Sequence, residues 1–170
     1  MNLLRVCGYV AILQLSGLAI GQSTDATATA PATTAAPLVK LSVMAEKVEF
    51  PQKQDIQLTV TVQNDSTEDL KFGSVATVLD YSITVIDEHG NQAKELPAKR
   101  DALRDETGGT MGLVGARGGK LPDEIVISRY FDLRTPGTYS IEFRRTVSDV
   151  KGKSYDLVSN KLKITVKKPE

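Results

Sequence analysis

Apolar and polar residues alternate along several stretches between residues 38 and 168, and this period of two predicts β-strands with one buried face. The strictest alternation runs from Ile56 to Val62, where every second residue is aliphatic. No stretch has a convincing long helical period, so we expect an all-β domain of about seven strands. The predicted inward-facing sets are Val39, Leu41 and Val43; Ile56, Leu58, Val60 and Val62; Tyr81, Ile83 and Val85; Ile125 and Ile127; Tyr139, Ile141 and Phe143; and Leu162, Ile164 and Val166.

Turn signals separate these stretches. Asn64–Thr67 and Asp87–Asn91 are rich in Asn and Asp, whose side chains bond the local backbone and tolerate left-handed dihedral angles. The second of these also has a central Gly, as hairpin turns often do. Thr135–Thr138 contains a Pro-Gly pair. Short strands joined by such turns favour an antiparallel β-sandwich of two layers.

The C-terminal part of the chain carries the most specific pattern. A Pro136-Gly-Thr-Tyr139 turn leads into a strand, and the chain finishes with Ser159-Asn-Lys-Leu-Lys-Ile-Thr-Val166. Together with the order of strands and the Asn at the end of the second strand, these features make residues 38–168 resemble an immunoglobulin-like or fibronectin type III-like sandwich of bacterial exported proteins. The motifs of this resemblance are structural and carry no chemistry of their own.

The resemblance implies a structural role for one tyrosine. In immunoglobulin domains a tyrosine two residues before the second cysteine bonds the backbone upstream and fixes a corner of the sandwich. Tyr139 matches that tyrosine, and Ile141 occupies the place of the cysteine. The partner cysteine would fall near Leu58 or Val60, and Ile83 is the expected substitute for the tryptophan that packs between the cysteines. A disulfide-free relative with Tyr139 as its structural corner is therefore implied.

The N-terminus reads as a secretory signal peptide covering residues 1–21. Arg5 provides the short positive region, Val6–Ile20 is mostly apolar, and Ala19–Gly21 places small residues at the cleavage positions. The apolar run is shorter than the roughly 20 residues that a membrane-spanning helix needs. Cys7 is the only cysteine and lies within this predicted signal, so we expect a mature chain without thiols, disulfides or a thiolate zinc site. The location that follows is secreted or periplasmic.

Residues 22–37 consist almost wholly of Ser, Thr, Ala and Pro, without periodic apolar positions. Such a composition cannot bury enough surface to offset the entropy of ordering, so we expect a disordered linker ahead of one folded domain, residues 38–168. Lys plus Arg and Asp plus Glu both total 21. This balance gives no general attraction to nucleic acid or to an anionic membrane.

The sequence offers little support for catalysis, and we expect no catalytic residue, no metal site and no cofactor. His89 is the only histidine, and a lone histidine cannot supply the several imidazoles of a typical catalytic zinc site. Its neighbours, Asp87 and Glu88, are the polar residues that turns collect in any case. The chain contains no Gly-x-Ser-x-Gly nucleophile motif, and Gly115–Lys120 lacks residues that a phosphate-binding loop requires.

Two further patterns have a plain structural interpretation. Arg144, Lys161 and Lys163 fall on the outer face of the final strands, with Arg145 nearby, and such cations are typical of solvated sheet edges. Asn64-Asp-Ser66 fits the N-glycosylation acceptor pattern. Because Asn64 also begins a turn, we favour a structural role for it.

The most unusual segment is residues 100–121, which six glycines interrupt and which is long for a connection between strands. One interpretation is an apolar and basic contact patch for a partner. The other, which the length of the segment favours, is a mobile crossover between sheets with residues 111–114 as a short strand. The candidate contact residues are Arg104, Met111, Leu113, Val114 and Arg117.

From these features we expect a non-enzymatic exported module that contacts a protein or a glycan at the cell envelope or outside the cell. The alternative is a secreted protease inhibitor that presents the 100–121 segment to an active-site cleft. Neither hypothesis fixes the partner or the oligomeric state.

Overall fold

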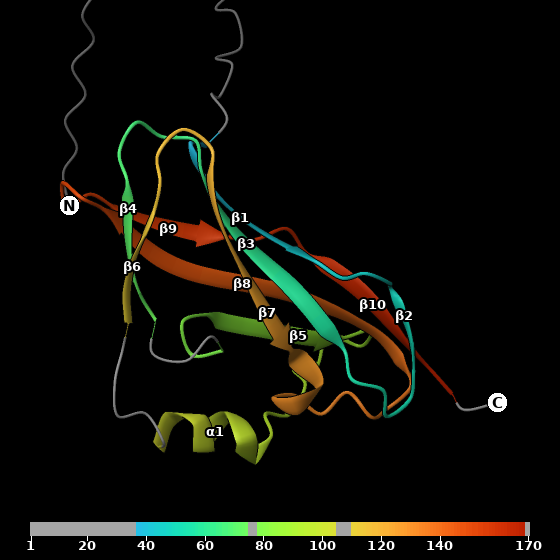
Figure 1. Ribbon diagram of the computed structural model, residues 1–170. Coiled ribbons are helices and arrows are strands. Elements are labelled where there is room, and N and C mark those ends of the chain that lie inside the picture. The colour runs from blue at the N-terminus through green and yellow to red at the C-terminus, as the bar shows by residue number, and fades with distance from the viewer. Residues whose placement is uncertain (1–36, 75–77, 105–109, 169–170) are drawn as a thin grey trace, which may run out of the picture. The chain divides into compact units, whose positions relative to one another are not determined.

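The computed structural model describes residues 37–74, 78–104 and 110–168, and these form an almost all-β unit of two sheets (Figure 1). The predicted signal peptide and all but the last residue of the predicted linker lie outside the described residues. Within the described part of the chain, no helix is long and apolar enough to cross a membrane.

The smaller sheet has three antiparallel strands in the order β1-β3-β7. They are β1 (Val39–Met44), β3 (Gln57–Asn64) and β7 (Gly119–Val126). The strict alternation in β3 produces a strand whose even-numbered residues are buried throughout. The central strand of this sheet is therefore the one with the clearest pattern in the sequence.

The larger sheet is built around β8 (Gly137–Asp149), which is 13 residues long. The register places β10 and then β9 along one edge of β8, and β5 and then β4 along the other. All of these pairings are antiparallel, whereas β2 pairs with β10 in parallel, so the sheet is mixed. Its other strands are β2 (Glu49–Pro51), β4 (Leu70–Ser74), β5 (Ser82–Asp87), β6 (Thr110–Val114), β9 (Ser154–Val158) and β10 (Leu162–Lys167).

The hydrophobic core lies between the two sheets and includes all of the residues that the alternation predicted to face inward except Leu162, which is only partly buried. It also contains residues outside those sets, such as Leu70, Phe131 and Leu133. Leu58 and Val60 of β3 and Ile141 and Phe143 of β8 are fully buried within it. The Tyr81 ring meets the Phe143 ring edge-on, with centroids 5.6 Å apart. Burial of each such aliphatic or aromatic side chain contributes about 1.5–3 kcal/mol, and the described core contains no disulfide to supplement it.

The described residues contain ten strands where the sequence predicted about seven, and two short helices in addition. Ile127 is buried as predicted, but it begins the 3-10 helix η1 (Ile127–Arg129) after β7 has ended. A second helix, α1 (Pro97–Arg104), opens with a proline, which suits the first turn of a helix because its missing N–H would have no partner there. At eight residues α1 is too short to show a clear helical period.

Tyr139 lies near the start of β8, just after the Pro-Gly turn. Its side chain is buried, and its hydroxyl donates a hydrogen bond of 2.7 Å to the Thr135 carbonyl, four residues upstream. Burial raises the pKa of this phenol above its ordinary value. This bond joins the two sides of the Pro-Gly turn that leads into β8.

Replacing Tyr139 with phenylalanine is expected to lower the free energy of unfolding by about 1 kcal/mol, because the Thr135 carbonyl loses its donor while the ring packing is kept. Urea denaturation followed by circular dichroism measures this change. Tyr130→Phe is the matched control, since the Tyr130 hydroxyl makes no hydrogen bond within the described residues. Equal stabilities of the two variants would show that the corner bond contributes nothing.

Candidate functional site

The described residues of segment 100–121 lie in a helix, in two strands and in the turn between those strands, while residues 105–109 lie outside the described residues. Arg104 is the last residue of α1, and residues 110–114 form β6, a strand at the end of the larger sheet. Arg117 lies in the turn between β6 and β7. The chain crosses from one sheet to the other at this turn, as a crossover between sheets would.

Within β6 the candidate contact residues divide between two faces. Met111 and Leu113 point outward and are 77% and 61% exposed, whereas Val114 is 3% exposed and packs in the core. In the register with β4, Leu113 is opposite Lys71 and Met111 is opposite Gly73. The outer face of this two-stranded ribbon therefore presents two large apolar side chains beside one lysine. We call Lys71, Met111 and Leu113 the β6 surface.

The inner face of the ribbon explains a glycine in the middle of β6. The Phe72 ring of β4 lies over Gly112, and a Cβ atom at Gly112 would lie 2.3 Å from Phe72 Cζ. Real carbon atoms do not approach so closely, so a side chain at position 112 would require the Phe72 ring to move. The aromatic ring covers the space that the glycine leaves. The same arrangement of an aromatic side chain over a glycine stabilises edge strands in other β-sheet proteins.

The turn that carries Arg117 is tied to the loop after β3. Its backbone N–H donates to the Ser66 carbonyl at 2.9 Å, and the Gly118 N–H donates to the Asn64 carbonyl at 2.7 Å. Arg117 and Gly118 both have positive φ, at 59° and 101°. The Arg117 side chain is exposed and forms no ion pair within the described residues, so its charge is open to a partner.

Asn64 is the hub of that loop and is fully buried. Its side-chain amide nitrogen shares its two N–H groups among the carbonyls of Glu68, Val114 and Gly115, at 2.9, 3.1 and 3.2 Å. Its side-chain oxygen accepts bonds from the Ser66 backbone and hydroxyl. The nitrogen that a glycan would need is thus engaged with three carbonyls, so the acceptor pattern at this position is structural in the folded chain.

Arg145 is not part of the basic outer surface where the sequence placed it, because its side chain is 4% exposed. Its guanidinium donates to the Tyr81 hydroxyl at 3.1 Å and to the Gly73 carbonyl at 3.0 Å, and it lies 3.5 and 3.7 Å from the carboxylates of Asp123 and Asp80. Tyr81 in turn donates to Asp123 at 2.5 Å, and burial, followed by this bond, raises the pKa of its phenol. We call Arg145, Asp80, Asp123 and Tyr81 the buried charge cluster. Because Asp123 belongs to β7 and Arg145 to β8, it joins the two sheets.

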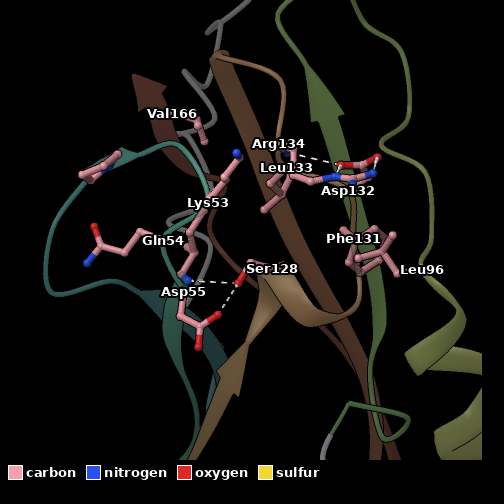
Figure 2. Close-up of a pocket in the computed structure, with 12 residues that line it drawn as sticks. Lys53, Gln54, Asp55, Leu96, Ser128, Phe131, Asp132, Leu133, Arg134 and Val166 are labelled. Carbon is pink, nitrogen blue, oxygen red and sulfur yellow. Dashed lines mark hydrogen bonds and ion pairs between the residues drawn. The ribbon is translucent and has the colours of Figure 1, made fainter. Parts of the chain in front are cut away.

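Sequence reasoning also missed a pocket of about 200 Å³ at the end of the sandwich where β2 ends and β3 begins (Figure 2). Its floor is apolar, and all of the residues that form it except Leu96 also belong to the core. The floor residues are Ile56, Leu96, Phe131, Leu133 and Val166. They come from widely separated parts of the chain, so no local motif could have revealed the pocket.

Charged and polar side chains surround the mouth of this pocket. Arg134 holds Asp132 through two bonds of 2.7 and 2.8 Å, and this pairing lowers the pKa of Asp132 to about 2. On the other side, the Ser128 hydroxyl accepts the Ile56 N–H at 3.1 Å and faces the Asp55 carboxylate at 3.4 Å. Lys53 completes the rim and forms no ion pair with any described residue.

His89 and its neighbours Asp87 and Glu88 line a second pocket, of about 260 Å³, together with Asp132 and Tyr139. His89 lies exposed in the turn after β5, 3.7 Å from the Glu88 carboxylate. The Glu88 carboxylate accepts the Thr138 N–H at 3.1 Å and so serves the neighbouring turn. Among the described residues, no three His, Cys, Asp or Glu side chains are grouped so that they could hold a metal ion.

Comparison with known proteins adds no family. No protein-family model matches the chain, and no curated protein matches it. Among solved structures, the chain is similar to one described as "X-ray structure of Northeast Structural Genomics Consortium target SoR45", with 11% identity and a TM-score of 0.44. The match covers 76% of this chain and 87% of that chain, and at this level of similarity it carries no argument about function.

Proposed function

We propose that this chain is an exported, non-enzymatic module with an immunoglobulin-like sandwich, and that it binds a partner protein through the β6 surface. The strand order supports the fold assignment. β1, β3 and β7 share one sheet as strands A, B and E do in immunoglobulin domains, while β5, β8 and β10 correspond to C, F and G. The signal-like N-terminus, with Arg5 ahead of an apolar run, supports export.

The observation that carries the binding function is the exposure of Met111 and Leu113 together on an edge strand. Two adjacent large aliphatic side chains in water leave apolar surface that a partner would remove from solvent. Within the described residues β6 pairs only with β4, so its other edge can accept a strand from another chain. Edge strands that are not meant to pair usually carry charge or proline, and β6 carries neither.

The chemistry of the surface favours a protein over a glycan. Aliphatic side chains offer no hydrogen bonds to sugar hydroxyls, and burying a hydroxyl without such bonds is costly. Lys71 and Arg117 add positive charge without an ion-pair partner among the described residues. We therefore infer an extended segment with apolar side chains and acidic neighbours as the partner.

Because most of the 100–121 segment is paired in strands or fixed in a hydrogen-bonded turn, the geometry gives no separate support to the protease inhibitor. A titration of the chain against a panel of proteases still distinguishes the two functions. Stoichiometric inhibition of any of them would favour the inhibitor.

The direct test replaces Met111 and Leu113 with serine and measures partner affinity. We expect affinity to fall at least tenfold, because buried apolar anchors at an interface each contribute more than about 1 kcal/mol. The partner would be captured from the native envelope fraction, purified, and measured by interferometry against both forms of the chain.

A matched control replaces Leu38 and Met44, which are each 61% exposed but lie at or in β1. This double serine variant should bind as the unchanged chain does. If the β6 variant retains every captured protein at full affinity, the proposed surface is wrong. If sedimentation instead shows self-association that the β6 variant abolishes, the partner is a second copy of this chain.

A further inference from the structure

The pocket in Figure 2 has the size of a site for one large side chain. Its volume of about 200 Å³ is below the roughly 300–1,000 Å³ that is typical of pockets for drug-sized ligands. Ile56, Phe131 and Val166, at its floor, are nearly or fully buried and are held by the core packing of both sheets. A rigid apolar floor of this size suits an aliphatic group of a few carbons.

The pocket lining includes two cations, Lys53 and Arg134, and two carboxylates, Asp55 and Asp132, and Lys53 is the cation whose charge is not paired within the described residues. Asp132 neutralises Arg134, and Asp55 lies 3.6 Å from the Arg129 guanidinium, whereas Lys53 has no acidic partner among the described residues. Figure 2 shows the Lys53 side chain extending along the pocket toward the end where Arg134 lies. Arg134 remains largely exposed and keeps unused N–H donors, since Asp132 accepts from only two of its side-chain nitrogens.

The backbone at Lys53 is held in a conformation that lysine rarely adopts. Its φ is +67°, in a turn closed by the Gln54 N–H bond to the Pro51 carbonyl. The Gln52 side-chain amide also donates to the Arg134 carbonyl, which ties this turn to the opposite wall of the pocket. A glycine would suit the turn better, so the presence of a long cationic side chain here points to a role for that side chain.

We propose that this pocket binds a monocarboxylate with a short aliphatic body, with the carboxylate between Lys53 and Arg134 and the aliphatic group against Leu96 and Leu133, the floor residues that keep the most exposed surface. Two sources share this chemistry: the free C-terminus of a peptide that ends in an aliphatic residue, and a small branched carboxylic acid. This site is separate from the β6 surface, and its test does not depend on the proposed function.

The test is a chemical-shift titration of the isotopically labelled full chain with four probes. These are N-acetyl-leucine, N-acetyl-leucinamide, 4-methylpentanoate and an acetylated tripeptide ending in leucine. We expect the acids to shift the amide signals of residues 53–56 and 131–134, with dissociation constants on the order of 1 mM, and the amide to bind at least fivefold more weakly. Tighter binding of the tripeptide than of 4-methylpentanoate identifies a peptide C-terminus, and equal binding identifies a free acid.

Three variants separate the site from general surface charge. Lys53→Gly keeps the turn conformation and removes the ammonium group, so it should weaken N-acetyl-leucine at least fivefold without lowering the melting temperature. Lys53→Arg should retain most of the binding. Lys163→Gln, at an exposed lysine of β10 without an ion pair among the described residues, should have no effect. Equal binding of the acid and the amide, unchanged binding in Lys53→Gly, or no shifts at these residues would each overturn the proposal.

Discussion

Replacing Arg145 with methionine is expected to lower the free energy of unfolding by about 3–5 kcal/mol, because it removes the cation that faces the buried carboxylate of Asp80 and the partly buried carboxylate of Asp123. The loss of packing is small, since methionine keeps a long apolar side chain against Phe72 and Tyr81, over which the guanidinium now lies. Urea denaturation measures the change.

Two controls isolate the charge effect at Arg145. Arg144→Met removes a neighbouring arginine that is 60% exposed and pairs with Glu142, and it should cost less than about 1 kcal/mol. Adding Asp80→Asn and Asp123→Asn to the Arg145→Met chain should recover much of the loss, because the remaining groups are then neutral. If the triple variant is no more stable than Arg145→Met alone, the negative charge of these carboxylates is not the cause.

Replacing Asn64 with aspartate is expected to cost at least about 3 kcal/mol, although the two side chains have nearly the same shape. The carboxylate can still accept the two bonds from Ser66, but it cannot donate to the carbonyls of Glu68, Val114 and Gly115. Each buried acceptor that loses its donor costs about 1–3 kcal/mol, and here a negative charge would face all three. Thermal and urea denaturation both report the loss.

Asn160→Asp is the matched control for this prediction. Asn160 is exposed, and its amide donates to a single carbonyl, that of Val43, at 3.0 Å. The control should therefore cost only about 1 kcal/mol. If both variants lose a similar amount of unfolding free energy, the contacts of Asn64 with three carbonyls do not stabilise the fold more than the single bond of Asn160 does.

The strands that could be predicted from the sequence are those in which alternation continues over most of their length. In β3 and β8 the period of two arises because one face of each strand contacts the core. The buried positions can therefore be predicted from the amino-acid sequence of these strands. β6 gave no such signal, because Gly112 stands at an inward position and Met111 and Leu113 place apolar residues on the outer face. β2 has only three residues and cannot show a period at all.

The buried charge cluster illustrates a different kind of failure. The inward positions of β8 run from Tyr139 through Ile141 and Phe143 to Arg145 and Val147, so the alternation itself placed Arg145 inside. Residue type argued the opposite, since an arginine is rarely buried unless it is paired. Its partners lie on other elements, and only the folded chain brings Asp80 and Asp123 to it. The pocket was beyond prediction for the same reason, because four separate segments, residues 51–56, 96, 128–134 and 166, supply its lining.

The central place of β8 also sets the order in which the larger sheet can assemble. β4 and β5 precede β8 by many residues, yet both are completed by pairing with it, and β6 joins the sheet only through β4. β9 and β10 follow β8 directly and pair with it through local turns, while β2 in turn pairs with β10. Residues 1–136 are synthesised before β8 begins, so β4 and β5 have no partner in that strand until residues 139–149 have been added.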